Sequence, residues 1–215
     1  MSLTQELADF AASNGVDNMP KEVQDAFQVG MQEMLAKGIN ENALNVGDTV
    51  PDFEMPNQLG DPVKLSDLLA DGPLVISFYR GAWCPYCNIE LNGLQRRLPE
   101  ITDLGAKLVA ISPELPDNSL SLVEKNELSF DVLSDQGNKV ADAFGLVFTL
   151  AEALQPLYKQ FGIDLEAVNG DASMTLPTPA TYVVDTDRKI IGAYVDVDYS
   201  TRMDPDDIVA ALQAD

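Results

Sequence analysis

The chain has 215 residues, enough for one buried domain with an extension but too few for two domains of usual size. It carries 35 acidic and 13 basic side chains, and the net charge of −22 disfavours binding to nucleic acids or anionic membranes. It contains no histidine, which excludes Ser-His-Asp and Cys-His catalysis. Without a secretory signal or a run of roughly 18 apolar residues, the sequence predicts a cytoplasmic protein with no membrane partner.

The N-terminal region, residues 1–43, predicts a helical hairpin that precedes a separate domain in residues 44–215. Apolar side chains recur at helical spacing over residues 3–11, and a second helix is expected over residues 20–38. The hairpin has no core of its own, so we expect it to pack on the main domain or on a second subunit. The second alternative makes a homodimer possible.

The main domain alternates predicted strands with predicted helices. It begins with two short strands around the Gly60-Asp61 turn and a helix capped by Ser66. Residues 74–79 form an apolar run typical of a strand that is covered on both faces. Further strands are expected at 107–111, 130–133, 181–184 and 190–195, helices at 85–101, 116–127, 137–144, 151–162 and from 205, and a loop at 163–176. This order predicts an α/β fold with a central mixed β-sheet and helices on both faces.

The two cysteines of the chain lie three positions apart, in the order Cys84-Pro85-Tyr86-Cys87, between the first buried strand and a helix. Pro85 suits the first helical position, which places Cys84 at the N-cap, where free N–H groups and the helix dipole favour a thiolate. Cys87 follows one turn later, close enough to form a disulfide. Two cysteines are too few for a four-thiolate zinc site, so a redox pair is favoured over a metal site or two inert core cysteines.

Side chains around the pair leave alternatives open. Arg80 either lowers a thiol pKa or is a solvated loop residue. Trp83 and Tyr86 either shape a substrate surface beside the sulfurs or only pack. Glu90 is expected to be an exposed charge rather than a proton relay.

Three stretches of the chain resemble a known family: YRGAWCPYCNIEL at 79–91, PDFEMPNQLGDPVKLSDLL at 51–69 and TPATYVVDTDRKIIGAYVD at 178–196. Together they resemble the peroxiredoxin-like proteins of the alkyl hydroperoxide reductase and thiol-specific antioxidant (AhpC/TSA) group. The resemblance implies a thioredoxin-like fold and reduction of a peroxide or disulfide substrate. It also implies thioredoxin or a small thiol as the reductant, and no cofactor, because sulfur carries both electrons.

The resemblance to peroxiredoxins implies one set of roles for the cysteines. Peroxiredoxins usually carry P-x-x-x-T-x-x-C, in which the last cysteine attacks the peroxide. In this alignment Arg80 replaces the proline, Cys84 replaces the threonine, and Cys87 takes the place of the attacking cysteine. Pro179 stands where peroxiredoxins carry an arginine.

The W-C-x-x-C motif, with a proline before the later strand, also resembles thioredoxins and implies different roles. In thioredoxins the first cysteine, here Cys84, is the nucleophile, and the second, here Cys87, resolves the intermediate. Their proline is cis and faces the disulfide, which predicts a cis Thr178-Pro179 bond beside the cysteines, with Pro177 as the competing position.

We therefore expect a thiol peroxidase in which a sulfenic acid on one cysteine is converted to a Cys84–Cys87 disulfide by the other. The missing threonine and arginine favour an alternative, a thiol-disulfide oxidoreductase with little peroxidase activity. A non-enzymatic alternative is a redox-sensing interaction protein, in which the disulfide alters docking of the N-terminal hairpin.

Overall fold

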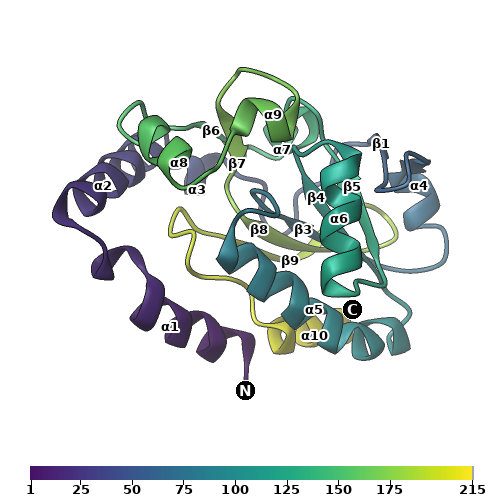
Figure 1. The fold of residues 1–215 in the computed structure, drawn as a ribbon. Coiled ribbons are helices and arrows are strands. Elements are labelled where there is room, and N and C mark those ends of the chain that lie inside the picture. Colours follow the sequence, from purple (N-terminus) through teal and green to yellow (C-terminus); the bar gives the residue numbers. More distant parts are fainter. Residues whose placement is uncertain (215) are drawn as a thin grey trace.

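The computed structural model describes residues 1–214, and its centre is a five-stranded mixed sheet in the order β5-β4-β3-β8-β9 (Figure 1). The strands are β3 (Leu74–Phe78), β4 (Lys107–Ser112), β5 (Asp131–Ser134), β8 (Ala180–Val184) and β9 (Ile190–Val195). β3, β4 and β5 are parallel, whereas β8 is antiparallel to β3 and β9 to β8. Every residue of β3 is buried, as its apolar run predicts.

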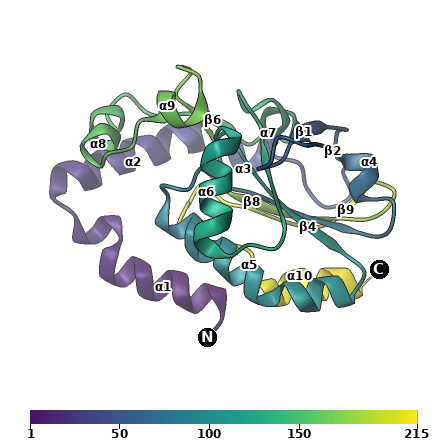
Figure 2. The ribbon, with the colours of Figure 1, turned by 45° about the vertical axis from the view of Figure 1, so that its right-hand side comes forward.

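Helices cover both faces of the sheet, which confirms the predicted α/β, thioredoxin-like architecture. α5 (Pro85–Asp103) and α10 (Pro205–Gln213) lie on one side of the strands, and α4 (Leu65–Leu68) and α7 (Lys139–Ala143) lie on the other (Figure 2). α6 (Pro116–Asn126) joins the side of α5 through Leu122. Alternation along β3 sends Val75 into the core beneath α5 and Ile76 into the opposite core.

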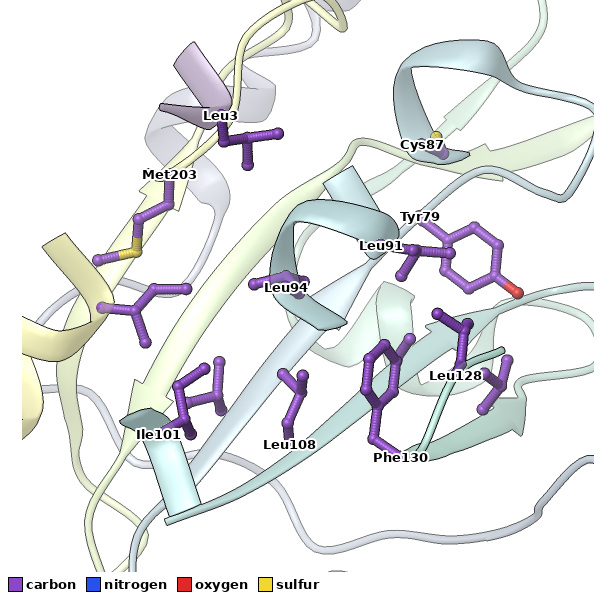
Figure 3. Packing of buried hydrophobic residues seen from close by; sticks show 14 of the residues in the cluster. Leu3, Tyr79, Cys87, Leu91, Leu94, Ile101, Leu108, Leu128, Phe130 and Met203 are labelled. Carbon is purple, nitrogen blue, oxygen red and sulfur yellow. The ribbon is translucent and has the colours of Figure 1, made fainter. Parts of the chain in front are cut away.

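The core beneath α5 lies directly behind the cysteines. It gathers Leu91 and Leu94 of α5 with Leu108 of β4 and Phe130, and Cys87 lies at its upper end (Figure 3). All of these side chains are at least nine-tenths buried. The start of α5 is therefore anchored by the helix turns that follow it.

The N-terminal extension contains α1 (Leu3–Asn14), the 3-10 helix η1 (Val16–Asn18), α2 (Lys21–Ala36) and α3 (Ile39–Asn42), and it runs around one end of the sheet (Figure 1). Leu3 and Leu7 of α1 enter the core beneath α5. Ala26 of α2 joins a different cluster, with Leu154 and Tyr158. The extension thus packs on its own domain through these side chains, and the homodimer stays a prediction.

Two local predictions for the main domain are wrong. Residues 163–176 contain α9 (Leu165–Asn169), capped by Asp164, and β7 (Thr175–Pro177), which pairs with β6 (Val147–Thr149). Both elements are too short for their apolar residues to show a helical or strand periodicity in the sequence. Ser66 lies inside α4 and does not cap it.

The remaining elements follow the prediction more closely. β1 (Glu54–Pro56) pairs with β2 (Pro62–Lys64) around the turn at Gly60. α8 (Gln155–Gln160) is shorter than the helix expected there. Among residues 1–214, the helices are all too short or too polar to cross a bilayer.

Candidate active site

Cys84 is the N-cap residue of α5, and Pro85 is the first residue of the helix, as the motif predicts. The Cys84 N–H donates to the carbonyl of Gly81 at 3.1 Å, which closes the turn after β3. The Asn88 side chain donates to the carbonyl oxygens of Ala82 at 2.7 Å and Cys84 at 2.9 Å. These bonds hold the cysteine loop against the first turn of α5.

Gly81 allows the loop to fold back tightly on itself. Its φ is +156°, and a Cβ at this position would lie 2.3 Å from Nε1 of Trp83. A larger residue at this position would therefore displace the indole ring of Trp83, which lies beside the cysteine loop.

The Cys84 sulfur is fully buried and faces a guanidinium group. Arg80 donates to Sγ from Nη2 at 3.2 Å. Burial by itself raises the pKa of the Cys84 thiol, but a hydrogen bond from Cys87 and the charges of Arg80 and Arg202 outweigh it. The pKa of Cys84 consequently lies well below its usual value, and the thiolate is the favoured form.

Arg80 is only 6% exposed, so the alternative of a solvated loop residue is wrong. Its guanidinium carbon lies 4.3 Å from the ring centroid of Tyr199 and 5.4 Å from that of Trp83. Nη1 donates to the Tyr158 hydroxyl at 3.4 Å, whereas Nε has no partner among the described residues. Aromatic rings thus hold the cation against the sulfur.

Cys87 ionises less readily than an ordinary cysteine, in contrast to Cys84. Arg202 donates to its sulfur from Nη2 at 3.4 Å. Burial, the hydrogen bond to Cys84 and the charge on Cys84 together raise the pKa of Cys87 well above its usual value, despite Arg202. The two pKa values therefore move in opposite directions, that of Cys84 down and that of Cys87 up.

The expectation that Glu90 is an exposed charge is wrong, because its side chain is buried beneath Cys87. It forms a buried ion pair with Arg202 and accepts hydrogen bonds from Ser77 at 3.2 Å and Thr181 at 3.4 Å. Burial raises its pKa, although Arg202 acts in the opposite direction. The position of Glu90 on its helix does not by itself indicate that the side chain is buried. Its hydrogen-bond partners come from β3, β8 and the segment between β9 and α10.

Two charged residues of the site were not predicted. Arg202 reaches Glu90 and Cys87 from more than 110 residues away, and nothing in its local sequence signals this. Glu114 follows β4 and accepts the Ala82 N–H at 2.8 Å. Burial raises the pKa of Glu114 to about 7. In a chain without histidine, it is a buried group that titrates near neutral pH beside the cysteine loop.

Trp83 and Tyr86 pack against other aromatic rings, and their role at a substrate surface stays a prediction. Trp83 packs edge-on against Tyr158, and Tyr86 packs edge-on against Phe10 and Tyr199. Both, with the exposed Pro85, also line a cavity of about 470 Å³. The cavity reaches Arg80 and so opens beside the Cys84 loop.

The prediction of a cis bond before Pro179 is wrong, because every peptide bond over residues 1–214 is trans, including those before Pro177 and Pro179. Pro179 immediately precedes Ala180, which pairs with Phe78 at the end of β3. Thr178 is buried, and its N–H donates to the Leu146 carbonyl at 2.8 Å. In the described chain, the charged hydrogen bonds to the sulfurs come from Arg80 and Arg202 and not from this segment.

Comparison with known proteins agrees with this fold and site. The AhpC/TSA family model matches residues 46–193. A putative peroxiredoxin of Mycobacterium tuberculosis is 31% identical over 171 residues, which are 80% of this chain and 97% of that protein. Peroxiredoxin Bcp of Escherichia coli is 34% identical over 105 residues, 49% of this chain and 67% of its own. The crystal structure of the peroxidoxin BcpB of Mycobacterium tuberculosis, 30% identical, superposes with a TM-score of 0.63 over 80% of this chain and 97% of that one.

These similarities define a thioredoxin-fold protein with a thiol-based active site. The chain belongs to the AhpC/TSA family, among the peroxiredoxins related to Bcp. The predicted family and fold are thereby confirmed, as is the prediction of a thiol-dependent oxidoreductase.

Proposed function

We propose that Cys84 and Cys87 carry the thiol-dependent, peroxide-reducing antioxidant activity of this peroxiredoxin-family enzyme, with Cys84 as the attacking sulfur. The observation that carries the proposal is the contact between Arg80 and Cys84 at 3.2 Å. Beside this cation the pKa of Cys84 falls well below its usual value, whereas the pKa of Cys87 is raised. Only the thiolate is an effective nucleophile.

In the first step the Cys84 thiolate attacks one oxygen of the peroxide. An S–O bond forms as the O–O bond breaks, and the leaving oxygen takes up a proton and departs as an alcohol or as water. Sulfur has lost two electrons and carries a sulfenic acid. The charges of Arg80 and Arg202 stabilise the developing oxyanion in this buried site.

In the second step the Cys87 sulfur attacks the sulfenic acid. An S–S bond forms, the S–O bond breaks, and water leaves with the proton of the Cys87 thiol. Two thiol groups of a reductant then exchange with the disulfide and restore both cysteines. We assign thioredoxin or a small thiol to this role and the cytoplasm to the enzyme, because recycling needs a reducing compartment.

The decisive experiment is stopped-flow oxidation of the reduced protein by hydrogen peroxide, in wild type and in the variants Cys84→Ser and Cys87→Ser. We expect rapid oxidation of wild type and of Cys87→Ser, with a stable sulfenic acid only in the latter. Cys84→Ser is expected to react no faster than a free thiol. Rapid oxidation of Cys84→Ser instead assigns the attack to Cys87, the position that matches the peroxiredoxin motif.

A thiol-disulfide oxidoreductase is the second candidate, favoured by the W-C-x-x-C arrangement with its low-pKa first cysteine. It predicts slow oxidation by peroxide in all three proteins but rapid reduction of a disulfide substrate that depends on Cys84. The same samples, mixed with a protein disulfide instead of peroxide, separate the two functions.

A further inference from the structure

Glu114 is a buried carboxyl beside the cysteine loop that the proposed mechanism leaves unused. The residue is 1% exposed, and its side chain accepts the Ala82 N–H, two residues before Cys84, at 2.8 Å. Among residues 1–214 it forms no ion pair, in contrast to Glu90, whose partner is Arg202. A carboxyl that is buried without a counter-ion favours its neutral, protonated form.

The titratable groups that face Glu114 come from the end of β3 and from the cysteine loop. The Tyr79 hydroxyl stays neutral, because burial and the charge of Glu114 both raise its pKa, although Ser112 and Ser119 act in the opposite direction. The Cys84 sulfur is the other group. Burial is the main cause that raises the pKa of Glu114 to about 7, and a negative charge on Cys84 acts in the same direction. The charge on this sulfur therefore influences whether Glu114 holds a proton.

The loop also holds a donor for the ionised form of Glu114. Nε1 of Trp83 is buried and has no hydrogen-bond partner among the described residues. A Cβ at Gly81 would lie 2.3 Å from this nitrogen and 3.0 Å from Oε1 of Glu114, so the two atoms border the same point. An ionised carboxylate accepts stronger hydrogen bonds than a neutral carboxyl does. The Ala82 N–H and the indole N–H can thus stabilise the carboxylate when it forms.

The charge on Cys84 changes during the proposed cycle. A thiolate is present in the reduced enzyme and absent from both the sulfenic acid and the disulfide. Loss of this neighbouring negative charge makes Glu114 easier to ionise. The leaving oxygen of the peroxide takes up one proton at the same stage of the cycle. In a chain without histidine, a buried carboxyl close to neutrality is suited to balance that proton.

We propose that Glu114 stores the proton of the redox cycle: it is protonated while Cys84 is a thiolate and ionised once Cys84 is oxidised. On oxidation the peroxide takes two electrons from Cys84, and the proton lost by Glu114 balances the one taken up by the leaving oxygen. On reduction two thiol groups of the reductant become a disulfide and release two protons, one to Cys87 and one to Glu114. The inference rests on the proposed chemistry of Cys84 and Cys87.

The redox equilibrium of the protein with dithiothreitol tests this linkage. Because reduction of wild type binds an additional proton, its equilibrium constant for reduction, divided by that of Glu114→Gln, should fall as the pH rises. A coupling of one pKa unit gives a fall of about tenfold between about pH 5 and about pH 8. Glutamine still accepts the Ala82 N–H, and a merely structural effect changes the ratio by the same factor at every pH. Glu152→Gln, at an exposed position, should show the pH dependence of wild type.

Infrared difference spectra give an independent test on the unaltered protein. Slightly below neutral pH, the C=O band of a protonated carboxyl should be present in reduced wild type and should be lost on oxidation. The same difference should be absent from Glu114→Gln. A ratio of equilibrium constants that is constant with pH, or a wild-type spectrum without this change, overturns the inference. Neither measurement uses peroxide, so slow oxidation in the stopped-flow experiment overturns the proposed peroxidase function and not this linkage.

Discussion

Arg80 and Arg202 each direct one guanidinium nitrogen at a different sulfur, at 3.2 Å and 3.4 Å. Their settings differ, because Arg202 is paired with the buried carboxylate of Glu90, whereas Arg80 is surrounded by aromatic rings. A carboxylate neutralises part of the field of its partner, and an aromatic ring does not remove charge. Arg80 is therefore the stronger influence on its sulfur, and the two thiols ionise differently.

Replacement of Arg80 by methionine, which keeps an unbranched stem but removes the charge, should raise the pKa of Cys84. An opposite charge in contact shifts a pKa by about one to three units, so the thiolate titration should move to higher pH by about that amount, and the peroxide rate constant below the new pKa should fall with the thiolate fraction. The pH dependence of thiolate absorbance measures the pKa. Arg188→Met, in an exposed turn, is the matched control. An unchanged thiolate titration in Arg80→Met contradicts the role given to this cation.

Glu114 makes stability depend on pH in a predictable direction. Its folded pKa is raised from 4.5 to about 7 by burial, so the folded protein holds a proton that the unfolded chain has already lost between these values. Stability is thus lost as pH rises through that window. The free energy of unfolding of Glu114→Gln, relative to that of wild type, should therefore be higher at pH 8 than at pH 5 by up to about 3 kcal/mol. About 2.5 pKa units correspond to that energy.

Urea unfolding of the reduced protein at both pH values measures this difference. Glutamine still accepts the Ala82 N–H, so the hydrogen bond is kept and only the charge is removed. Glu152→Gln, at an exposed position, corrects for the general effect of one charge. Identical pH dependence in Glu114→Gln and wild type shows that the carboxyl titrates normally.

At the scale of elements, the sequence was informative where an element has a strong local signal. The apolar run of β3 and the proline after Cys84 predicted a strand, a turn and an N-cap, and all three are present. The site was predicted only in part, because its charges converge from distant segments. Arg202, between β9 and α10, and Glu114, after β4, meet the cysteines through the topology of the sheet and not through spacing.

The docking of α1 can be measured through one side chain. Leu7 is 3% exposed in the core beneath α5, so Leu7→Ala should cost about 2–3 kcal/mol in free energy of unfolding. Leu35→Ala on α2 is the control, since Leu35 is 46% exposed and should change stability by less than about 0.5 kcal/mol. Equal effects of the two variants in urea unfolding indicate that α1 is not docked in solution.

At the scale of the whole molecule, a net charge of −22 surrounds a site whose own cations, Arg80 and Arg202, are buried. An approaching reductant meets the negative field first and the arginines only on contact. Small thiols that carry a negative charge should therefore be slowed on approach, and those that carry a positive charge should be accelerated.

This difference predicts opposite salt effects on recycling of the oxidised enzyme. Raising ionic strength from about 0.01 M to about 1 M shortens the Debye length from about 30 Å to about 3 Å, which removes the long-range field. The rate of disulfide reduction by the anion thioglycolate should then rise, whereas the rate with the cation cysteamine should fall. The rate with each thiol at high ionic strength is compared with the rate of the same thiol at low ionic strength. Differences in reactivity between the two thiols therefore do not affect the result. Parallel salt effects for the two thiols contradict the prediction, and reversed salt effects show instead that the contact charges of the arginines govern access to the disulfide.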